Sequence, residues 1–157
     1  MYIDDIAQIY EGENLKFILE EDRQRIWFRA ATKNMAELVV LGRIVDPNTV
    51  MFTTAMPVNI PADKRDVMTV YLNRVNWGTI LGNFEMDPSD GRVSYRVTGC
   101  YDETDEVNED VIIRMTYIGL NMFEKYAPGM FAIVYGNKSP EEAFREAEQN
   151  YRAGQTE

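Results

Sequence analysis

The chain has 157 residues, the length of one domain, and its 26 acidic against 16 basic residues give a net charge of −10. Histidine is absent and cysteine occurs once, which excludes His-dependent nucleophiles, His-ligated and Cys-cluster metal sites, iron–sulfur clusters and phosphohistidine relay. The excess of acidic residues argues against a nucleic-acid surface, because each phosphate contact needs a cation. Hydrophobic residues make up 45% of the chain, which is enough for a folded core. We expect one domain over residues 1–157, with a loose tail from about residue 153.

The first half of the chain predicts a short helix followed by an antiparallel meander of four strands. Tyr2 and Ile6 stand with other apolar residues at helical spacing, and Gly12 follows at the position of a C-terminal cap. The next apolar stretches alternate with charged residues or end at turn signals, which is typical of strands. The predicted strands cover residues 15–20, 26–30, 38–45 and 50–56.

A second helix is predicted between Pro61 and Gly78, with one apolar stripe that must cover a sheet face. The stripe consists of Met68, Tyr71, Leu72 and Val75. A hairpin follows, because residues 82–87 and 92–100 flank a Pro-Ser-Asp-Gly turn. The second strand of this hairpin alternates strictly between apolar and polar residues, which predicts one dry face and one wetter face.

Two helices are predicted at the end of the chain. Asn108 suits the N-cap of the first of them, and we expect that helix to end near Tyr126, where Ala127-Pro128-Gly129 interrupts the pattern. The apolar residues from Met130 to Tyr135 fit either a short helix or a strand, and we favour a helix. Ser139 begins a capping box that starts the last helix.

The expected order of elements is α-β-β-β-β-α-β-β-α-α. Antiparallel strands separated from helices in this way predict an α+β fold, in which the helices pack on one face of the sheet. A parallel βαβ series is not predicted. The nucleotide crevices and receiver domains that depend on such a series are therefore not expected.

Nothing in the sequence predicts export or insertion into a membrane. The start, MYIDD, is acidic and unlike a signal peptide, and the longest apolar run, residues 130–135, is far shorter than the ~18 residues of a membrane span. A single cysteine cannot form an internal disulfide. We therefore expect a soluble cytoplasmic protein.

Two groups of carboxylates are candidates for acid–base or metal chemistry. Glu85 and Asp87 lie beside the hairpin turn, and Asp102 and Asp105 belong to the densest acidic cluster, residues 102–110. A plain hairpin turn and a solvated loop before a helix N-terminus account for both groups more simply. We predict no catalytic residue, no metal ligand and no cofactor.

The end of the second helix and the first helix supply the candidate residues for binding a partner. Asn73 and Asn76 are one helical turn apart, so both amides could reach a partner, although a satisfied amide network is the simpler interpretation. Trp77 follows them, and Tyr2 and Ile6 of the first helix complete the set. An open edge of the sheet could in addition accept an extended segment.

Basic residues cluster on the first hairpin around Trp27 and Phe28. They are Arg23, Arg25, Arg29 and Lys33. Aromatic and basic residues side by side are also found in nucleic-acid platforms. The net charge of the chain instead favours an acidic protein partner or a snorkelling sheet edge, so no nucleic-acid partner is expected.

Two segments resemble the YbjN domain family. They are residues 71–97, YLNRVNWGTILGNFEMDPSDGRVSYRV, and residues 126–143, YAPGMFAIVYGNKSPEEA. The family is one of bacterial sensory transduction regulators, and its fold is similar to that of type III secretion chaperones, which are small, acidic, usually dimeric α+β proteins that hold extended client segments. The resemblance implies no catalytic or cofactor residue at any position of this sequence.

The expected function is that of a non-enzymatic protein-binding module, chaperone-like or regulatory, that acts as a homodimer on an unidentified protein client. Two alternatives stay open. A small-ligand sensor would have an enclosed apolar cavity lined by Met and Tyr side chains. A carboxylate- or metal-assisted enzyme would bring Glu85, Asp87, Asp102 and Asp105 together in a deep pocket, with shifted pKa values.

Overall fold

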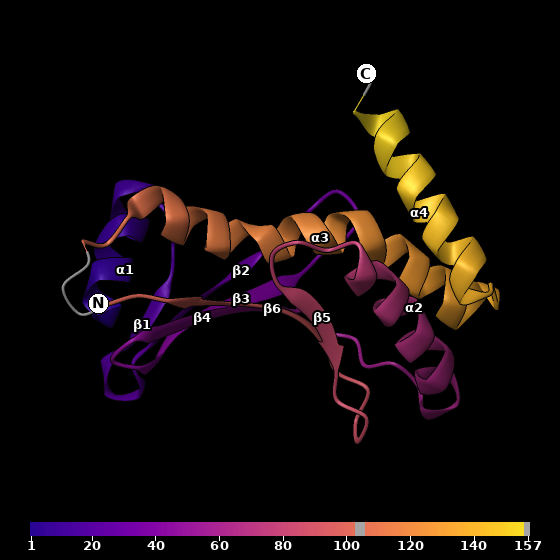
Figure 1. The fold of residues 1–157 in the computed structure, drawn as a ribbon, viewed down its shortest axis with the longest axis horizontal. Coiled ribbons are helices and arrows are strands. Elements are labelled where there is room, and N and C mark those ends of the chain that lie inside the picture. Colours follow the sequence, from indigo (N-terminus) through magenta and orange to yellow (C-terminus); the bar gives the residue numbers. More distant parts are fainter. Residues whose placement is uncertain (103–105, 156–157) are drawn as a thin grey trace.

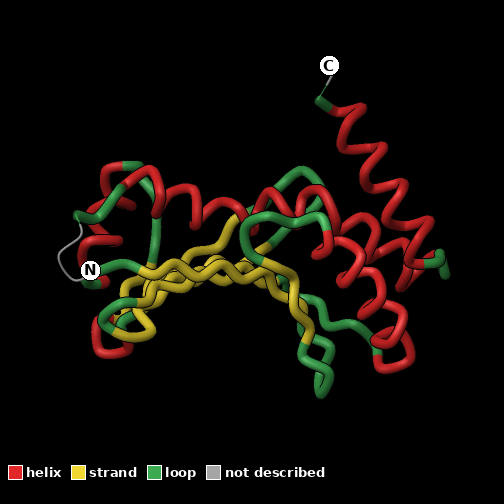
Figure 2. Tube along the Cα trace, in the orientation of Figure 1, coloured by secondary structure: helices red, strands yellow, loops and turns green. Residues whose placement is uncertain are grey.

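The computed structural model describes residues 1–102 and 106–155. Its strands form one antiparallel six-stranded sheet in the order β1-β2-β3-β4-β6-β5. α1 and α3 lie across one face of this sheet, α2 lies beside β5 at one end, and α4 projects beyond α3 (Figures 1 and 2). The α+β class with helices on one face is confirmed.

The order of the elements is the predicted one. They are α1 (Ile3–Gly12), β1 (Ile18–Glu20), β2 (Arg25–Ala30), β3 (Leu38–Asp46), β4 (Thr49–Ala55), α2 (Arg65–Trp77), β5 (Asn83–Met86), β6 (Val93–Cys100), α3 (Glu109–Gly136) and α4 (Pro140–Gly154). Short 3₁₀ turns cover Glu21–Arg23 and Ala62–Lys64. The caps predicted at Asn108 and Ser139 are confirmed, because each side chain accepts a hydrogen bond from a backbone N–H in the first turn of its helix.

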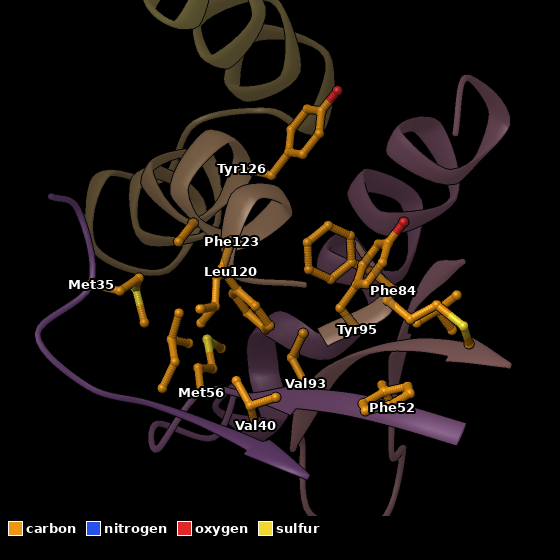
Figure 3. Close-up of a cluster of buried hydrophobic side chains, with 14 of the residues drawn as sticks. Met35, Val40, Phe52, Met56, Phe84, Val93, Tyr95, Leu120, Phe123 and Tyr126 are labelled. Atoms are coloured by element: carbon orange, nitrogen blue, oxygen red, sulfur yellow. The ribbon is translucent and has the colours of Figure 1, made fainter. Parts of the chain in front are cut away.

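The core lies between the helices and the face of the sheet that they cover. Every second residue of β2, β3, β4 and β6 points into it, and Val93, Tyr95 and Val97 form the dry face predicted for β6. The ring of Phe84 stands edge-on to Tyr95 and Phe123, at centroid distances of 4.9 and 5.1 Å, and so joins β5, β6 and α3 (Figure 3). The remaining face of each strand is left for solvent or for a partner.

The prediction that a helix ends near Tyr126 is wrong, because α3 continues through Pro128 to Gly136. The proline has no N–H to donate to the Glu124 carbonyl one turn earlier. The side-chain amide of Asn34 donates to that carbonyl instead, at 2.9 Å. Residues 130–135 are therefore helical, as favoured, but they belong to the same helix as the residues before the proline.

Two glycines of α3 allow close packing. A Cβ on Gly119 would lie 2.5 Å from the Cβ of Thr54 on β4, and one on Gly129 would lie 2.7 Å from the Cζ of Tyr71 on α2. The hydroxyl of Tyr71 donates to the carbonyl of Tyr126 at 2.8 Å in the same contact. Glycine at these positions thus sets how closely α3 approaches the sheet and α2.

Both ends of the chain differ in detail from the predictions. Gly12 is the last residue of α1 and the left-handed backbone conformation falls at Asn14, with φ 56°. At the other end, α4 continues to Gly154, so residues 153 and 154 are helical. Residues 156–157 of the predicted loose tail lie outside the described residues.

Candidate functional site

One face of the sheet carries no helix from the part of the chain that the structure describes, and we call it the uncovered face (Figure 1). Its central side chains are apolar and half-buried: Trp27, Val39, Leu41, Met51 and Ala55. The strand register places Leu41 opposite Trp27 on one side and Thr53 on the other. Exposed Arg29, Arg43 and Arg96 surround this centre. Arg29 and Arg96 are paired with Glu37 and Glu85, so the uncovered face is an apolar surface with a charged rim.

The hairpin that joins β5 and β6 turns away from the helices and forms a wall beside the uncovered face (Figures 1 and 2). Between the wall and the sheet lies a hollow of about 590 Å³. Its floor consists of Val39, Leu41, Thr53 and Ala55, and Met86 and Pro88 contribute to the wall. A side chain of a partner or a small ligand would meet mostly apolar atoms on this floor.

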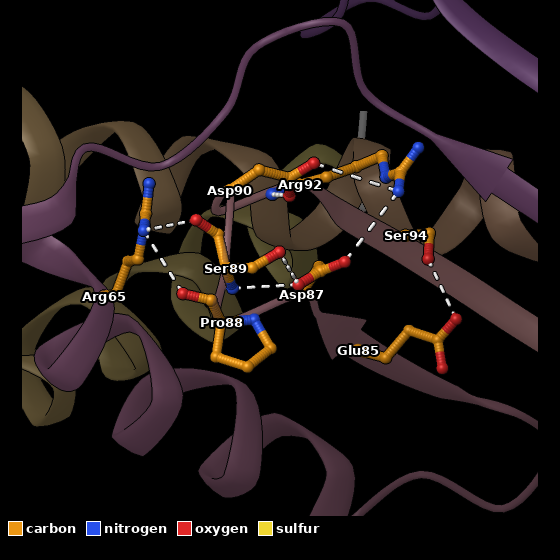
Figure 4. Close-up of polar contacts among 8 residues, drawn as sticks. All are labelled: Arg65, Glu85, Asp87, Pro88, Ser89, Asp90, Arg92 and Ser94. Carbon is orange, nitrogen blue, oxygen red and sulfur yellow. Dashed lines mark hydrogen bonds and ion pairs between the residues drawn. The ribbon is translucent and has the colours of Figure 1, made fainter.

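The tip of the hairpin is fixed in place by Arg65 at the start of α2. Its guanidinium donates to the carbonyls of Ile60, Pro88 and Ser89 at 3.1, 3.2 and 3.1 Å, and Figure 4 shows the two bonds to the hairpin. The N–H of Ile60 donates to the carbonyl of Gly91 at 2.8 Å. Gly91 has a φ of 79°, which only glycine adopts without strain. The wall of the hollow is thus held from two sides.

The carboxylates that line the hollow already make hydrogen bonds or ion pairs with other residues of the chain (Figure 4). Asp87 accepts hydrogen bonds from the hydroxyl and the N–H of Ser89, at 2.6 and 2.8 Å, and these bonds hold the pKa of its carboxyl below the usual value. Glu85 accepts from the Ser94 hydroxyl at 3.1 Å and pairs with Arg96. A carboxyl with a lowered pKa stays ionised at neutral pH, so Asp87 is not placed to act as an acid.

The convergence expected for a carboxylate enzyme is only partial. Glu85 and Asp87 both line the hollow, whereas Asp102 does not, and Asp105 lies outside the described residues. Among residues 1–102 and 106–155, no group of three or more His, Cys, Asp or Glu side chains could hold a metal ion. The hollow also differs from the cavity expected for a ligand sensor, because no tyrosine lines it.

Asn76 connects α2 to the edge of the sheet. Its Nδ2 donates to the carbonyl of Phe84 at 2.9 Å, and its Oδ1 accepts from the N–H of Phe84 at 2.9 Å. β6 pairs with the other edge of β5, so the Asn76 amide takes the place that a further strand would occupy. The side-chain amide of Asn76 is thus engaged within the chain, as the simpler of the two interpretations predicts. Asn73, on the same helix, is exposed.

The other edge of the sheet is less protected. β1 pairs with Arg25–Trp27, whereas β2 pairs with β3 along its whole length, so Phe28, Arg29 and Ala30 lie at the edge beyond the end of β1. The arginines of this hairpin make ion pairs within the chain: Arg25 lies 2.7 Å from Glu20, and its hydrogen bond lowers the pKa of that carboxyl. Arg23 and Arg29 likewise lie within 4.0 Å of carboxylates of the chain.

The two candidate residues of α1 have different environments. Tyr2 precedes the helix with 74% of its surface exposed. Ile6 is fully buried in the core. Burial is the physical reason for removing Ile6 from the candidate surface, since a side chain without solvent exposure cannot contact a partner while the fold is intact.

Trp77 belongs to a surface that the sequence predictions found only in part. Trp77 is 87% exposed and Ile80, in the turn after α2, is fully exposed, while Val70 and Val67 lie exposed on the same side of the helix. We call these four residues the α2 patch. Residues 67–84 contain no Asp or Glu, although the chain has 26. This gap in the acidic residues is the signal in the sequence that could have indicated the patch.

Comparisons with known proteins agree on one family. The family model of YbjN, described as "Putative bacterial sensory transduction regulator", matches residues 2–132, so α4 lies outside the match. The crystal structure of YbjN from E. coli, titled a "putative transcription regulator", is similar with a TM-score of 0.55 and 13% identity, over 78% of this chain and 87% of that one. No curated protein matches the sequence. Within the described residues, no helix is long and apolar enough to cross a membrane.

Proposed function

This chain belongs to the YbjN family, described as regulators, and from that premise we propose that it is a cytoplasmic regulatory protein that acts by binding another protein, as a homodimer and without catalysis. The bound protein is held on the uncovered face. A chaperone-like mode, in which the bound segment is extended, is part of the proposal because the open edge beyond β1 adjoins that face at Trp27.

The single observation that carries this function is the apolar centre of the uncovered face. An antiparallel sheet can leave one face to solvent, and that face is then normally polar. Here Trp27, Val39, Leu41 and Met51 occupy its centre instead. Apolar side chains gathered on one surface and surrounded by charged residues are typical of a protein-binding site.

The fixed hairpin favours binding as well. Arg65 holds the wall of the hollow through the carbonyl groups of Pro88 and Ser89, so a partner would not have to order this segment when it binds. Binding costs less free energy when the surface is ordered beforehand. Arg29 and Arg96 on the rim are paired with Glu37 and Glu85, so Arg43 is the rim arginine that favours an acidic residue in the partner segment.

The polar groups of the hollow support binding over catalysis. A general acid or base needs a pKa near the working pH. The pKa of Asp87 is lowered instead, by its hydrogen bonds from Ser89. Glu85 is held by Ser94 and Arg96. These contacts fix the hairpin, which is a structural role.

Ligand sensing is the second candidate function, and one observation favours it. The hollow has a volume of about 590 Å³. This value falls within the range of small-molecule sites. A ligand bound there would contact Leu41 and Thr53 without any protein partner.

Site-specific photo-crosslinking in the native cells tests the proposed function. A photoreactive phenylalanine analogue at Leu41, on the uncovered face, should form a discrete adduct with another protein. The same analogue at Gln8, exposed on α1, is the matched control. Equal adducts at both positions, or none at Leu41, would contradict protein binding at this face. A thermal stabilisation of purified protein by small molecules without any adduct would favour ligand sensing instead.

Light scattering tests the homodimer separately. Each chain has a mass of 18.1 kDa, so a dimer has twice that mass. A monomer at micromolar concentration would remove the dimer from the proposal and leave the binding surface untouched.

A further inference from the structure

We infer that a hollow between α3 and α4 is a second binding site, which takes the phosphate group of a small organic molecule through Lys33, Asn150 and Tyr151. We call it the α4 hollow. The inference goes beyond the proposed function, because no step of it requires a bound protein. The wall that α4 contributes lies outside residues 2–132, which the family model matches, so membership of the family does not imply this site.

Three segments that are distant in the sequence form the α4 hollow. α4 leaves α3 at an angle (Figure 1), and residues 33 and 34, between β2 and β3, line the space together with both helices. The backbone N–H of Asn34 donates to the Glu124 carboxylate at 2.8 Å, which ties this segment to α3. The volume is about 400 Å³. That is within the range of small-molecule sites and leaves room for an organic part beside a phosphate group.

Hydrogen-bond donors from two opposing segments remain free in the α4 hollow. Lys33 comes from the segment between β2 and β3, whereas Asn150 and Tyr151 come from α4. The polar ends of these three side chains have no hydrogen-bond or ion-pair partner within residues 1–102 and 106–155. A phosphate group has oxygens in several directions and can accept from both segments at once. The two oxygens of a carboxylate lie in one plane and are best matched by the fork of an arginine, which the lining does not contain.

The charge around the α4 hollow is positive, although the whole chain has a net charge of −10. Glu124 is the one carboxylate among the described residues that line it, and its Oε2 already accepts a backbone N–H. The neighbouring Glu148 lies 2.8 Å from Lys125 and 4.0 Å from Arg152. With Lys33, three cations thus stand against two carboxylates. A concave surface with such an excess of cations attracts an anion.

The α4 side of the hollow is ordered by contacts within the chain. The ammonium of Lys125 lies 4.9 Å from the centre of the Tyr126 ring and 5.0 Å from that of the Tyr151 ring. Its ion pair with Glu148 ties α3 to α4 at the same place. Tyr151 is therefore held before a ligand arrives, which lowers the free-energy cost of binding.

Titration of the full chain with inorganic phosphate, followed by ¹H–¹⁵N NMR spectra, tests the site. The ionic strength is kept constant with sodium chloride, because salt screens exposed charges. The backbone amides of Lys33, Asn34 and Tyr151 should shift and saturate together. The dissociation constant should be on the order of 1 mM, the affinity that a few charge-assisted hydrogen bonds provide.

Three variants identify the groups that bind the anion. Lys33→Glu should raise the dissociation constant at least about tenfold, the factor expected for the loss of one charge-assisted hydrogen bond. Asn150→Ala should raise it about fivefold, because the lost amide is neutral. Lys16→Glu is the matched control: Lys16 is also an exposed lysine, it lies outside the α4 hollow, and its replacement changes the net charge equally. The control should bind phosphate like the wild type, and the spectra show that each variant is folded.

Two further probes separate recognition of the phosphate from recognition of the organic part. Glycerol 3-phosphate should shift the same amides as inorganic phosphate, and glycerol should leave them unchanged. Shifts with glycerol alone would overturn recognition of the anion.

The remaining outcomes are equally decisive. Absence of saturable shifts, shifts spread over lysines and arginines elsewhere on the surface, or equal losses of affinity in Lys33→Glu and Lys16→Glu would each overturn the site. None of these results depends on adducts at Leu41, so a failure of this inference and a failure of the proposed function are told apart.

Discussion

Replacing Asn76 with alanine tests whether this amide closes the edge of the sheet. The variant loses both hydrogen bonds to Phe84, each 2.9 Å long, and leaves the N–H of that residue without its partner, while the carbonyl keeps a bond from the side-chain amide of Asn83 at 3.2 Å. Each bond contributes about 1 kcal/mol, so the loss amounts to about 2 kcal/mol. For a domain of this length, a loss of that size lowers the melting temperature by about 4–8 °C.

Asn73→Ala is the control, because alanine favours a helix over asparagine by about 0.5 kcal/mol at either position. Asn73 is exposed on the same helix, so this substitution should raise the unfolding free energy slightly. Urea unfolding followed by circular dichroism measures both variants. If Asn76→Ala is no less stable than Asn73→Ala, the amide does not close the edge and the interpretation fails.

Three further predictions concern packing, pH and the uncovered face. Gly119→Ala should lower the unfolding free energy by about 3 kcal/mol or more, because its Cβ would lie 2.5 Å from a side-chain carbon of β4. A loss below about 1 kcal/mol in urea unfolding would contradict the close approach of α3 to the sheet. Burial opposes ionisation of Glu148, but hydrogen bonds from Lys125 and Tyr126 lower its pKa below the usual 4.5. The ionised Glu148 therefore contributes its full stabilisation above pH 4.5, and this stabilisation is lost as the pH falls through the lowered pKa. The difference in unfolding free energy between wild type and Glu148→Gln should shrink between about pH 5 and pH 3. A difference that stays constant over this range would contradict the lowered pKa. Leu41→Glu should change the unfolding free energy by less than about 1 kcal/mol and still prevent adducts from a photoreactive analogue placed at Val39 on the same face. Adducts that persist would contradict binding at Leu41.

The sequence was sufficient for the order of the elements because local signals agree with the fold. Alternation along β6 and the stripe on α2 both describe the faces that are buried. The length of α3 could not be predicted in the same way. Pro128 indicates a break, and the donor that permits continuation, Asn34, is distant in sequence.

The candidate site was predicted only where one residue type is informative by itself. Trp77 is exposed, as a partner contact requires, whereas Ile6 has the same apolar character and is buried. Periodicity shows that a helix has an apolar side but does not show what packs against a residue. The uncovered face left one trace: Leu38 to Leu41 are apolar at every position, so β3 has apolar side chains on both faces, and which face the helices leave free becomes clear only from the fold.

The two tryptophans lie on separate surfaces, Trp27 on the uncovered face and Trp77 on the α2 patch. Hydroxyl-radical labelling read by mass spectrometry compares their oxidation in the purified protein and in the protein labelled inside the native cells. We predict that the oxidation of Trp27, relative to that of Trp77, falls several-fold in the cells, because the bound protein covers the uncovered face. An unchanged ratio would contradict partner binding on the sheet.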